Sequence, residues 1–303
     1  MAGALSFTDA DGVEVAYYRW DPTSAARAVV LIAHGASEHG ARYDRFATFL
    51  TEHGYAVFAQ DHRGHGNTAK STGVGLTGPN GWLGLIEDQH QMNLLARAAV
   101  PDVPVVLFAH SMGSFMAQRY IQLYGDEIDG IVMSGSAGNM GDLASTIEFI
   151  DLIAQDTGLD TPAPSLSTFN EKFEPARTPF DWLSRDPDEV DKYIADPFCG
   201  DNNPLTIGYG RELYATLRDA WEPANESRLR RDLPVLFITG ELDPVSQEAT
   251  TVRLLEQRYR DHGLTDVTAI YYPDARHELL NETNRDDVQA DVLAWIDRVT
   301  LAS

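Results

Sequence analysis

The sequence contains a single cysteine, Cys199, among its 303 residues, which excludes an internal disulfide. We interpret Cys199 as a small buried hydrophobe and expect a reducing, cytoplasmic location. No apolar run approaches the roughly 20 residues that span a bilayer. The first eleven residues have neither the basic start nor the apolar core of a secretory signal.

Basic residues are also scarce, since 23 Lys and Arg stand against 46 Asp and Glu and give a net charge of −23. The only lysines are Lys70, Lys172 and Lys192. This balance disfavours nucleic-acid partners and attraction to an anionic membrane surface. Arginine in place of lysine on an acidic surface fits either a salt-rich habitat or the base composition of the genome, and both explanations stay open.

Sequence patterns for metal and nucleotide binding are absent. His277-Glu278 is followed by Leu-Leu-Asn, so the chain has no His-Glu-x-x-His zinc motif. It has no Gly-x-x-x-x-Gly-Lys phosphate loop and no dinucleotide fingerprint after the first expected parallel strand. We therefore expect a protein that needs no cofactor.

The sequence is rich in apolar runs that alternate with helix-like segments. Continuous apolar runs indicate strands that are covered on both faces, and the alternation predicts an α/β fold with a mostly parallel sheet between helices. A glycine-containing turn between two β-favouring runs, at 5–8 and 13–20, predicts a hairpin before this sheet. The expected strands are 28–33, 56–59, 105–108, 131–133, 234–239 and 268–272. The expected helices are 42–53, 87–99, 112–124, 247–259 and 285–299.

The alternation stops between about residues 139 and 227. This stretch is rich in proline, has no strong strand run and includes an amphipathic segment at 143–153. We predict a helical cap, residues 139–226, inserted into a core formed by 1–138 and 227–303. Such a cap would lie over the carboxyl ends of the strands, where ligands bind. An independent second domain is the alternative, which the small core of so proline-rich a piece disfavours.

One serine, Ser111, stands where an apolar strand run passes directly into a helix-like pattern. A corner of this kind strains the backbone and requires small neighbours two residues before and after, here Ala109 and Gly113. The usual pattern is Gly-x-Ser-x-Gly, so Ala109 departs from it by one methyl group. The hydroxyl of Ser111 would be exposed at the sheet edge beside the amide of Met112, as an acyl-transfer nucleophile requires.

A second serine, Ser136, has the same spacing within Ser134-Gly-Ser-Ala-Gly138. The residues after it include Gly138 and Gly141, which are poor helix starters. We therefore reject Ser136 as the nucleophile.

A serine hydroxyl becomes a good nucleophile when a histidine takes its proton and a carboxylate orients that histidine. His277 follows the last expected strand and Asp243 follows the strand before it, so both fall at the edge where Ser111 emerges. The order Ser, Asp, His along the chain is the one expected when the three meet there. Glu241 is the rival acid and His39 the first rival base.

The stretch from His34 to Gly40 directly follows a buried strand. Gly35 would let the backbone turn back so that the amide of Ala36 faces Ser111. With the amide of Met112, it would form an oxyanion hole, that is, a pair of donors for the negative oxygen of the reaction intermediate.

With these residues in place, the chain resembles the monoacylglycerol lipase and lysophospholipase branch of the α/β-hydrolase superfamily. The resemblance rests on residues 34–40 with Arg42-Tyr43, and on 61–66, 110–113, 240–244 and 274–278. It implies an α/β-hydrolase fold and a structural turn at 61–66 that supports the oxyanion loop. The chain departs from the family at two positions. Ala109 replaces the first glycine of the serine motif, and Ser114 stands where the family often has another glycine.

The resemblance also implies a catalytic triad of Ser111, Asp243 and His277, oxyanion amides at Ala36 and Met112, and a helical cap. We therefore expect a serine hydrolase that cleaves monoacylglycerols or similar single-chain carboxylic esters through an acyl-serine intermediate.

Three alternatives remain open. The first is a lysophospholipase, the second another reaction of the same triad, such as perhydrolysis or carbon–carbon bond hydrolysis, and the least favoured is a non-catalytic binding module. An apolar face of the cap, with Leu143, Ile147, Ile150 and Ile153, would receive the acyl chain and allow transient contact with a lipid interface. The sequence leaves the oligomeric state open.

Overall fold

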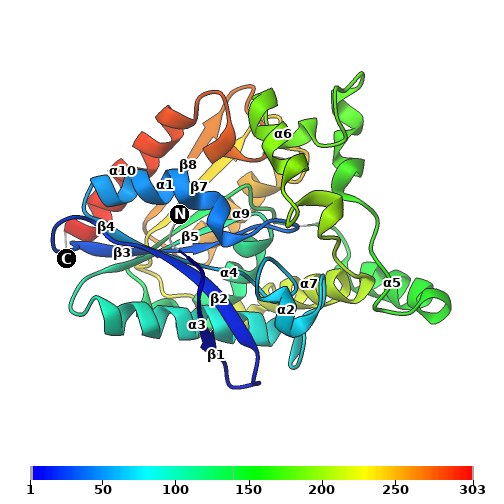
Figure 1. Cartoon of the computed structure of the whole chain (residues 1–303), viewed down its shortest axis with the longest axis horizontal. Coiled ribbons are helices and arrows are strands. Elements are labelled where there is room, and N and C mark those ends of the chain that lie inside the picture. Colours follow the sequence, from blue (N-terminus) through cyan, green and yellow to red (C-terminus); the bar gives the residue numbers. More distant parts are fainter. Residues whose placement is uncertain (1–2, 139, 302–303) are drawn as a thin grey trace.

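The structure is a computed structural model and describes residues 3–138 and 140–301. One sheet crosses the molecule, and its eight strands lie in the order β1-β2-β4-β3-β5-β6-β7-β8 (Figure 1). β1 and β2 form an antiparallel hairpin, β2 is also antiparallel to β4, and the other neighbouring strands are parallel. The strands are β1 (Leu5–Thr8), β2 (Glu14–Trp20), β3 (Ala28–Ala33), β4 (Tyr55–Gln60), β5 (Val105–His110), β6 (Gly130–Ser134), β7 (Val235–Gly240) and β8 (Val267–Tyr272).

Helices cover both faces of this sheet. α1 and α10 pack on one face, while α3, α4 and α9 pack on the other (Figure 1). Alternate residues of β3 point into the two cores, with Leu31 towards α3 and α4 and Ile32 towards α1 and α10. The core helices are α1 (Asp44–Glu52), α2 (Ala69–Thr72), α3 (Gly81–Ala99), α4 (Met112–Tyr124), α9 (Thr250–Asp261) and α10 (Arg285–Leu301), with short turns η1 (Gly40–Tyr43), η2 (Gly125–Glu127) and η6 (Leu279–Asn281). The α/β class, the hairpin and the mostly parallel sheet are therefore confirmed.

Three helix starts differ from the prediction. α1 begins at Asp44 rather than 42, because residues 40–43 form the 3-10 turn η1. α3 begins at Gly81 rather than 87, and its first turns bury Trp82, Leu85 and Ile86 in the core. α9 begins at Thr250 rather than 247, because the three residues before it have positive φ angles of 51°, 52° and 61° and form a turn. Positive φ is uncommon for residues other than glycine, so the helical pattern gives no sign of this turn.

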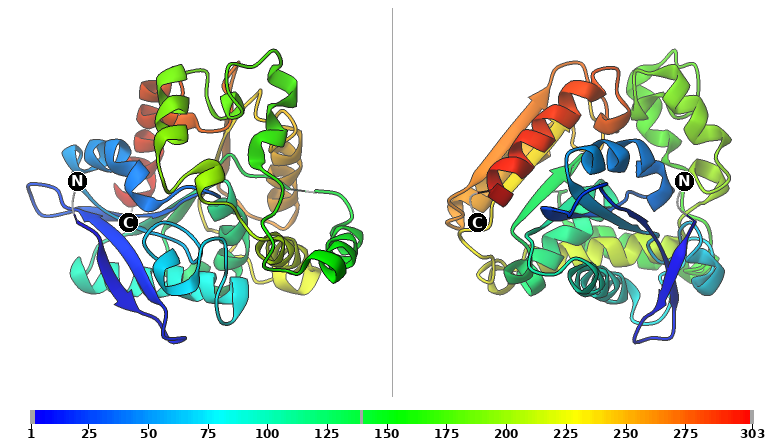
Figure 2. Two further views of the ribbon diagram at one scale, coloured as in Figure 1. Left: turned by 45° about the vertical axis from the view of Figure 1, so that its right-hand side comes forward. Right: turned by 60° about the vertical axis from the view of Figure 1, so that its left-hand side comes forward.

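A long segment separates β6 from β7 and carries helices and short 3-10 turns. Figure 2 shows these parts, coloured green to yellow-green, gathered at one side of the molecule. They are α5 (Leu143–Thr157), η3 (Leu166–Phe173), η4 (Asp181–Leu183), α6 (Pro187–Ala195), η5 (Gly200–Asn202), α7 (Ile207–Ala220) and α8 (Pro223–Glu226). α7 packs on α5 and also on α4, so the segment is joined to the core. Residue 139, the first of the expected cap, lies outside the described residues.

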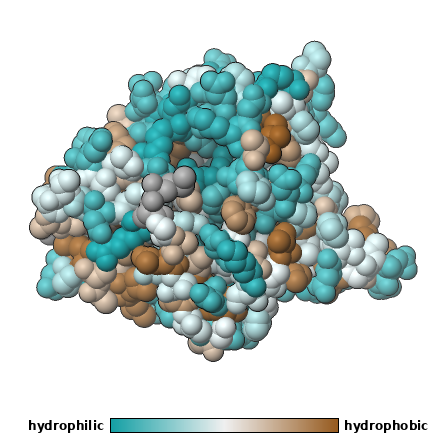
Figure 3. Space-filling view, in the orientation of Figure 1, coloured by the Kyte–Doolittle hydropathy of each residue, from teal (hydrophilic) through white to brown (hydrophobic). Residues whose placement is uncertain are grey.

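The surface is largely hydrophilic, as the acidic composition requires. Figure 3 shows polar side chains over much of one face, with smaller hydrophobic areas between them. On α5, Phe149 and Leu152 are 62% and 60% exposed, which is unusual for such large apolar side chains. Among the helices of the described residues, none is long and apolar enough to cross a membrane.

Candidate active site

Ser111 sits at the corner between β5 and α4 in a strained backbone conformation, with φ 49° and ψ −120°. Its amide donates to the carbonyl oxygen of Ser134 at 2.8 Å, which fixes the corner against β6. A Cβ atom at Gly113 would lie 2.4 Å from the carbonyl oxygen of Ala33, so only glycine lets α4 pack this closely on the end of β3. Ala109 is fully buried within β5, and its extra methyl group is part of the hydrophobic core.

His277 and Asp243 reach Ser111 from the loops after β8 and β7. Nε2 of His277 lies 2.9 Å from Oγ of Ser111, and its Nδ1 lies 2.9 Å from Oδ1 of Asp243. The amide of Val245 also donates to Oδ1 of Asp243 at 2.9 Å, which orients the carboxylate. Three side chains from three separate strand ends thus form one hydrogen-bonded chain.

The rival residues lie in other environments. Glu241 accepts a hydrogen bond from Arg253 at the surface. His39 pairs with Asp196 at 3.0 Å. Oγ of Ser136 is buried without a hydrogen-bond partner among the described residues, so no base is positioned to activate it.

The electrostatic surroundings of His277 favour its protonated form. Burial opposes protonation, but the negative charge of Asp243 and its hydrogen bond to Nδ1 outweigh burial and raise the pKa of His277 above its usual 6.5. The neighbouring His110 behaves oppositely, because burial and the nearby His277 lower its pKa to about 4. Of these two adjacent imidazoles, His277 is the stronger base.

Ala36, in the loop after β3, lines the same cavity as Ser111 and Met112. Neither Ala36 nor Met112 donates its N–H to an acceptor in the described parts of the chain. A Cβ atom at Gly35 would lie 3.1 Å from Cβ of Ser111, so glycine permits this close approach. Two backbone donors without partners therefore belong to residues that line the same cavity as the serine.

The turn at 61–66 holds this loop in place. Oδ1 of Asp61 accepts from the amide of Gly40 at 2.9 Å, and Nε2 of His65 accepts from the amide of Ser37 at 3.1 Å. Burial lowers the pKa of His65 to about 4, which keeps its ring neutral and able to accept.

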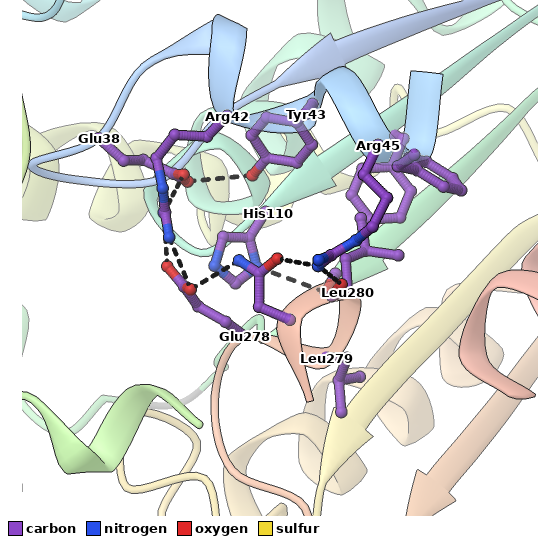
Figure 4. Close-up of a pocket in the computed structure, with 12 residues that line it drawn as sticks. Glu38, Arg42, Tyr43, Arg45, His110, Glu278, Leu279 and Leu280 are labelled. Carbon is purple, nitrogen blue, oxygen red and sulfur yellow. Dashed lines mark hydrogen bonds and ion pairs between the residues drawn. The ribbon is translucent and has the colours of Figure 1, made fainter. Parts of the chain in front are cut away.

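A buried ionic network, shown in Figure 4, connects the loop after β3 with the loop that carries His277. The guanidinium of Arg42 donates to Oε2 of Glu38 at 2.7 Å and to both carboxylate oxygens of Glu278 at 2.7 and 2.9 Å. Glu38 in turn accepts from the amide of Gly35. The network lies beside a small cavity of about 20 Å³. Our sequence analysis missed it, and its only sequence signal is the spacing of four residues between Glu38 and Arg42.

A larger cavity of about 820 Å³ opens at Ser111 and His277. Its walls come mainly from the segment between β6 and β7, and most of the side chains are apolar. They include Phe149, Ile150 and Ile153 of α5, Leu166 and Phe169 of η3, and Leu213 and Tyr214 of α7. Ile150 of the expected apolar face lines the cavity, whereas Leu143 and Ile147 pack into the protein with only 5% and 6% exposure.

The same segment also touches the triad directly. The ring of Trp182 lies 5.0 Å from the ring of His277, and the amide of Glu278 donates to the carbonyl oxygen of Leu183 at 2.8 Å. Sequence reasoning missed Trp182, because no local pattern in this proline-rich stretch points to it.

An eight-stranded sheet with a serine at the β5–α4 corner, a histidine after β8 and an acid after β7 is the arrangement of an α/β-hydrolase. A solved carboxyl esterase from Bacillus coagulans, in complex with glycerol, has the same fold. It aligns with a TM-score of 0.87 and 29% identity over 99% of both chains.

The chain belongs to the serine aminopeptidase S33 family, whose model matches residues 24–284. It is 32% identical to a monoacylglycerol lipase from Mycolicibacterium smegmatis, over 96% of this chain and 95% of the relative. It is 26% identical to the monoglyceride lipase of Mus musculus, over 91% of this chain and 87% of the relative. The chain is therefore a hydrolase, and the expected family resemblance is confirmed.

Proposed function

We propose that the protein hydrolyses monoacylglycerols or similar single-chain carboxylic esters, with Ser111 as the nucleophile. The observation that carries this proposal is the hydrogen-bonded chain Ser111–His277–Asp243 at the mouth of an apolar cavity of about 820 Å³. Relatives named as monoacylglycerol lipase and carboxyl esterase support the choice of ester chemistry.

In the first half of the reaction, Oγ of Ser111 attacks the ester carbonyl while Nε2 of His277 takes its proton. The imidazolium is stabilised by Asp243, whose carboxylate already accepts a hydrogen bond from Nδ1–H. The N–H groups of Ala36 and Met112 donate to the oxygen that becomes negative, and they need not give up other partners to do so. His277 then passes its proton to the leaving glycerol oxygen, which leaves the acyl group on Ser111.

In the second half, water attacks the acyl-serine. His277 takes a proton from this water and returns one to Oγ of Ser111 as the fatty acid leaves. Each proton moves between groups that the site already holds, so the cycle is balanced without a metal or an organic cofactor.

The shape and charge of the site support a neutral, single-chain substrate. The apolar walls suit one acyl chain, and each buried methylene contributes roughly 0.8 kcal/mol. The net charge of −23 opposes anionic head groups, an effect that weakens as the screening length falls to about 8 Å at physiological salt.

We also propose that residues 139–226 act as a cap on a core formed by 1–138 and 227–303, and that this cap touches lipid interfaces transiently. Two features support this role. The segment supplies most of the cavity walls, and α5 exposes Phe149 and Leu152 beside Ile153, which lines the cavity. Apolar side chains at a cavity rim are suited to contact with a lipid surface.

Initial rates on soluble monoacylglycerols of increasing chain length, lysophospholipids and emulsified triacylglycerols, each at low and high salt, test the substrate. We expect kcat/KM to rise with chain length until the cavity is filled and then to level off. The Ser111→Ala variant measures the background. Faster turnover of lysophospholipids or triacylglycerols than of monoacylglycerols at every salt concentration contradicts the proposal.

The cytoplasmic location and the lack of nucleic-acid partners stay predictions. Cell fractionation followed by detection of the protein in the soluble fraction tests the first. An electrophoretic shift assay with duplex DNA and RNA tests the second.

A further inference from the structure

Three potential metal ligands meet where the loop after β3 contacts the end of α6. They are the imidazole of His39, the carboxylate of Asp196 and the thiol of Cys199, and their ligand atoms all lie within 4.8 Å of one another. Nε2 of His39 lies 3.0 Å from Oδ2 of Asp196. His39 is 8% exposed and Cys199 is fully buried. Two of the three ligands are therefore buried, and the Asp196 side chain, 26% exposed, opens the cluster to solvent.

The hydrogen bonds of the cluster leave Nδ1 of His39 free to carry the ring proton when Nε2 binds an ion. Nδ1 of His39 is buried and has no hydrogen-bond partner among the described residues. Cys199 is a free thiol. Oδ1 of Asp196 accepts from the amide of Phe198 at 2.8 Å, which fixes the carboxylate so that Oδ2 faces His39. In metal sites, hydrogen bonds of this kind hold a ligating carboxylate in the orientation that the ion requires.

The charges around the cluster favour a cation. The ionic groups that act on Cys199 are one guanidinium, Arg42, and three carboxylates, Asp196, Glu38 and Glu278. Their formal sum is +1 − 3 = −2. A divalent ion would neutralise this sum. Burial raises the pKa of the Cys199 thiol, so the thiolate forms only as the ion binds.

We propose that His39, Asp196 and Cys199 bind a zinc ion, separate from the catalytic triad, with water as the fourth ligand. One imidazole nitrogen, one carboxylate oxygen and one thiolate sulfur form a donor set that suits zinc and its spectroscopic substitute cobalt. Zn–N and Zn–S bonds of about 2.0 and 2.3 Å place two tetrahedral ligands about 3.5 Å apart. Small side-chain rotations that draw the three atoms together complete the site.

Binding rearranges two protons. Nε2 of His39 binds the metal and the ring proton resides on Nδ1, which has no partner to lose. The thiol proton of Cys199 passes to a base in the solvent as the Zn–S bond forms. The hydrogen bond between His39 and Asp196 is replaced by two bonds to the ion.

The ion would join two parts of the chain that surround the active site. His39 belongs to the loop that also carries Ala36, whereas Asp196 and Cys199 belong to the segment between β6 and β7. The amide of Gly200 already donates to the carbonyl oxygen of Ser37 at 2.9 Å at this junction. Because the unfolded chain does not bring the ligands together, zinc would raise the melting temperature.

Cobalt titration of the metal-free protein tests the proposal, with a non-thiol reductant present. We expect visible absorption typical of tetrahedral cobalt and a near-ultraviolet thiolate-to-cobalt band, both abolished by an equivalent of zinc. Cys199→Ser should remove the thiolate band. Asp196→Asn and His39→Gln should weaken binding at least about tenfold, since loss of an outer-shell partner alone costs about 10–100-fold.

His90→Gln is the matched control, because His90 also pairs with a carboxylate, Glu127, at 2.9 Å and belongs to no such cluster among residues 3–138 and 140–301. It should bind cobalt as the unaltered protein does. If Cys199→Ser does not fold, Asp196→Asn carries the test, since this side chain is only partly buried. Absence of the cobalt spectrum, or equal affinity in Asp196→Asn and the unaltered protein, overturns the proposal. The optical readout does not depend on esterase activity, so it is independent of the proposed function.

Discussion

At the scale of single residues, Ser111 differs from every other serine of the described chain in its combination of a strained backbone and a direct contact with His277. Backbone strain persists where the surrounding structure over-determines it, and here β5, β6 and α4 all fix the corner. This conformation places the hydroxyl of Ser111 2.9 Å from Nε2 of His277.

Ser111→Ala should reduce kcat by about 10⁴-fold or more, because no other described hydroxyl lies in hydrogen-bond contact with His277. Ser136→Ala is the control, since Ser136 has the same sequence spacing but its hydroxyl has no hydrogen-bond partner in the described part of the chain. Its kcat should stay close to that of the unaltered protein. Labelling by a fluorophosphonate probe should follow the same pattern, and labelling that survives in Ser111→Ala would show that the nucleophile is another residue.

The pH dependence of kcat/KM reports the protonation of His277. This residue must be neutral to accept the proton of Ser111, and Asp243 raises its pKa despite burial. Activity should therefore rise with pH through a midpoint above the roughly 6.5 of a free histidine. In Asp243→Asn the residual activity should have a lower midpoint, because burial then acts without the opposing charge. A profile that is flat between about pH 5 and 8 would exclude a histidine base.

Arg42 forms ion pairs with two buried carboxylates, Glu38 and Glu278, so its removal should destabilise the folded protein. Arg42→Ala should lower the free energy of unfolding in urea by about 3–5 kcal/mol, the usual effect of leaving buried charge unpaired. Arg19→Ala is the control, because Arg19 pairs with Asp21 at the surface and should cost less than about 1 kcal/mol.

The pH dependence of stability should change in the same variant. Burial alone would raise the pKa of Glu278, but Arg42 outweighs burial and lowers it. A lowered pKa in the folded state stabilises the fold above the unfolded value of about 4.3, and this stabilisation is lost as the pH falls below it. Because the folded pKa of Glu278 is lowered to about 2, Arg42→Ala should lack this loss between about pH 4.3 and 2. If the unaltered protein and Arg42→Ala lost stability equally as the pH falls, this result would contradict the ion pair between Arg42 and Glu278.

At the scale of elements, α4 can present Ser111 only because it packs against the end of β3. Gly113 is the contact point, since the carbonyl oxygens of Ala33 and His34 lie 2.4 and 2.6 Å from where its Cβ would be. The loop after β3 and the amino terminus of α4 therefore share one fixed geometry, which sets both proposed oxyanion donors.

Gly113→Ala should shift α4 away from β3 and destabilise the protein by roughly 1–3 kcal/mol, the usual cost of overpacking. It should also lower kcat, because Met112 moves with the helix. Gly210→Ala in α7 is the matched control: nothing lies within 4 Å of its would-be Cβ, so it should gain roughly 0.5–1 kcal/mol from helix propensity. Thermal unfolding and initial rates distinguish the two variants. Equal stability in both would mean that α4 and β3 are not tightly packed.

At the scale of the whole molecule, the net charge of −23 lowers the stability of the folded state, because the negative side chains repel one another. Raising NaCl from about 0.01 to 1 M shortens the screening length from about 30 to 3 Å, and Tm should rise by at least about 2 °C. The rise should be smaller near pH 5, where more carboxylates are protonated. A Tm that does not respond to salt at neutral pH would mean that the acidic surface costs no stability. A large response would favour adaptation to salt over the base composition of the genome.

Local patterns in the sequence determined the strands, most helices, the serine corner and the two loops that carry Asp243 and His277. These features depend on neighbours in the chain: buried parallel strands are continuous apolar runs, and a strand that enters a helix without a loop needs small residues at the corner. Parallel topology then places the ends of β5, β7 and β8 at one edge, so residues far apart in sequence could be expected to meet.

Only the tertiary structure decided the contacts between segments that share no pattern. Arg42 joins Glu38 to Glu278, the ring of Trp182 contacts His277, and Cys199 lies beside His39. Apart from Arg42 and Glu38, the residues of each pair are separated by more than 90 positions in the sequence. Such contacts depend on how the irregular segment between β6 and β7 folds over the sheet. Its prolines and short 3-10 turns have no period from which a register could be predicted, so packing alone brings these side chains together.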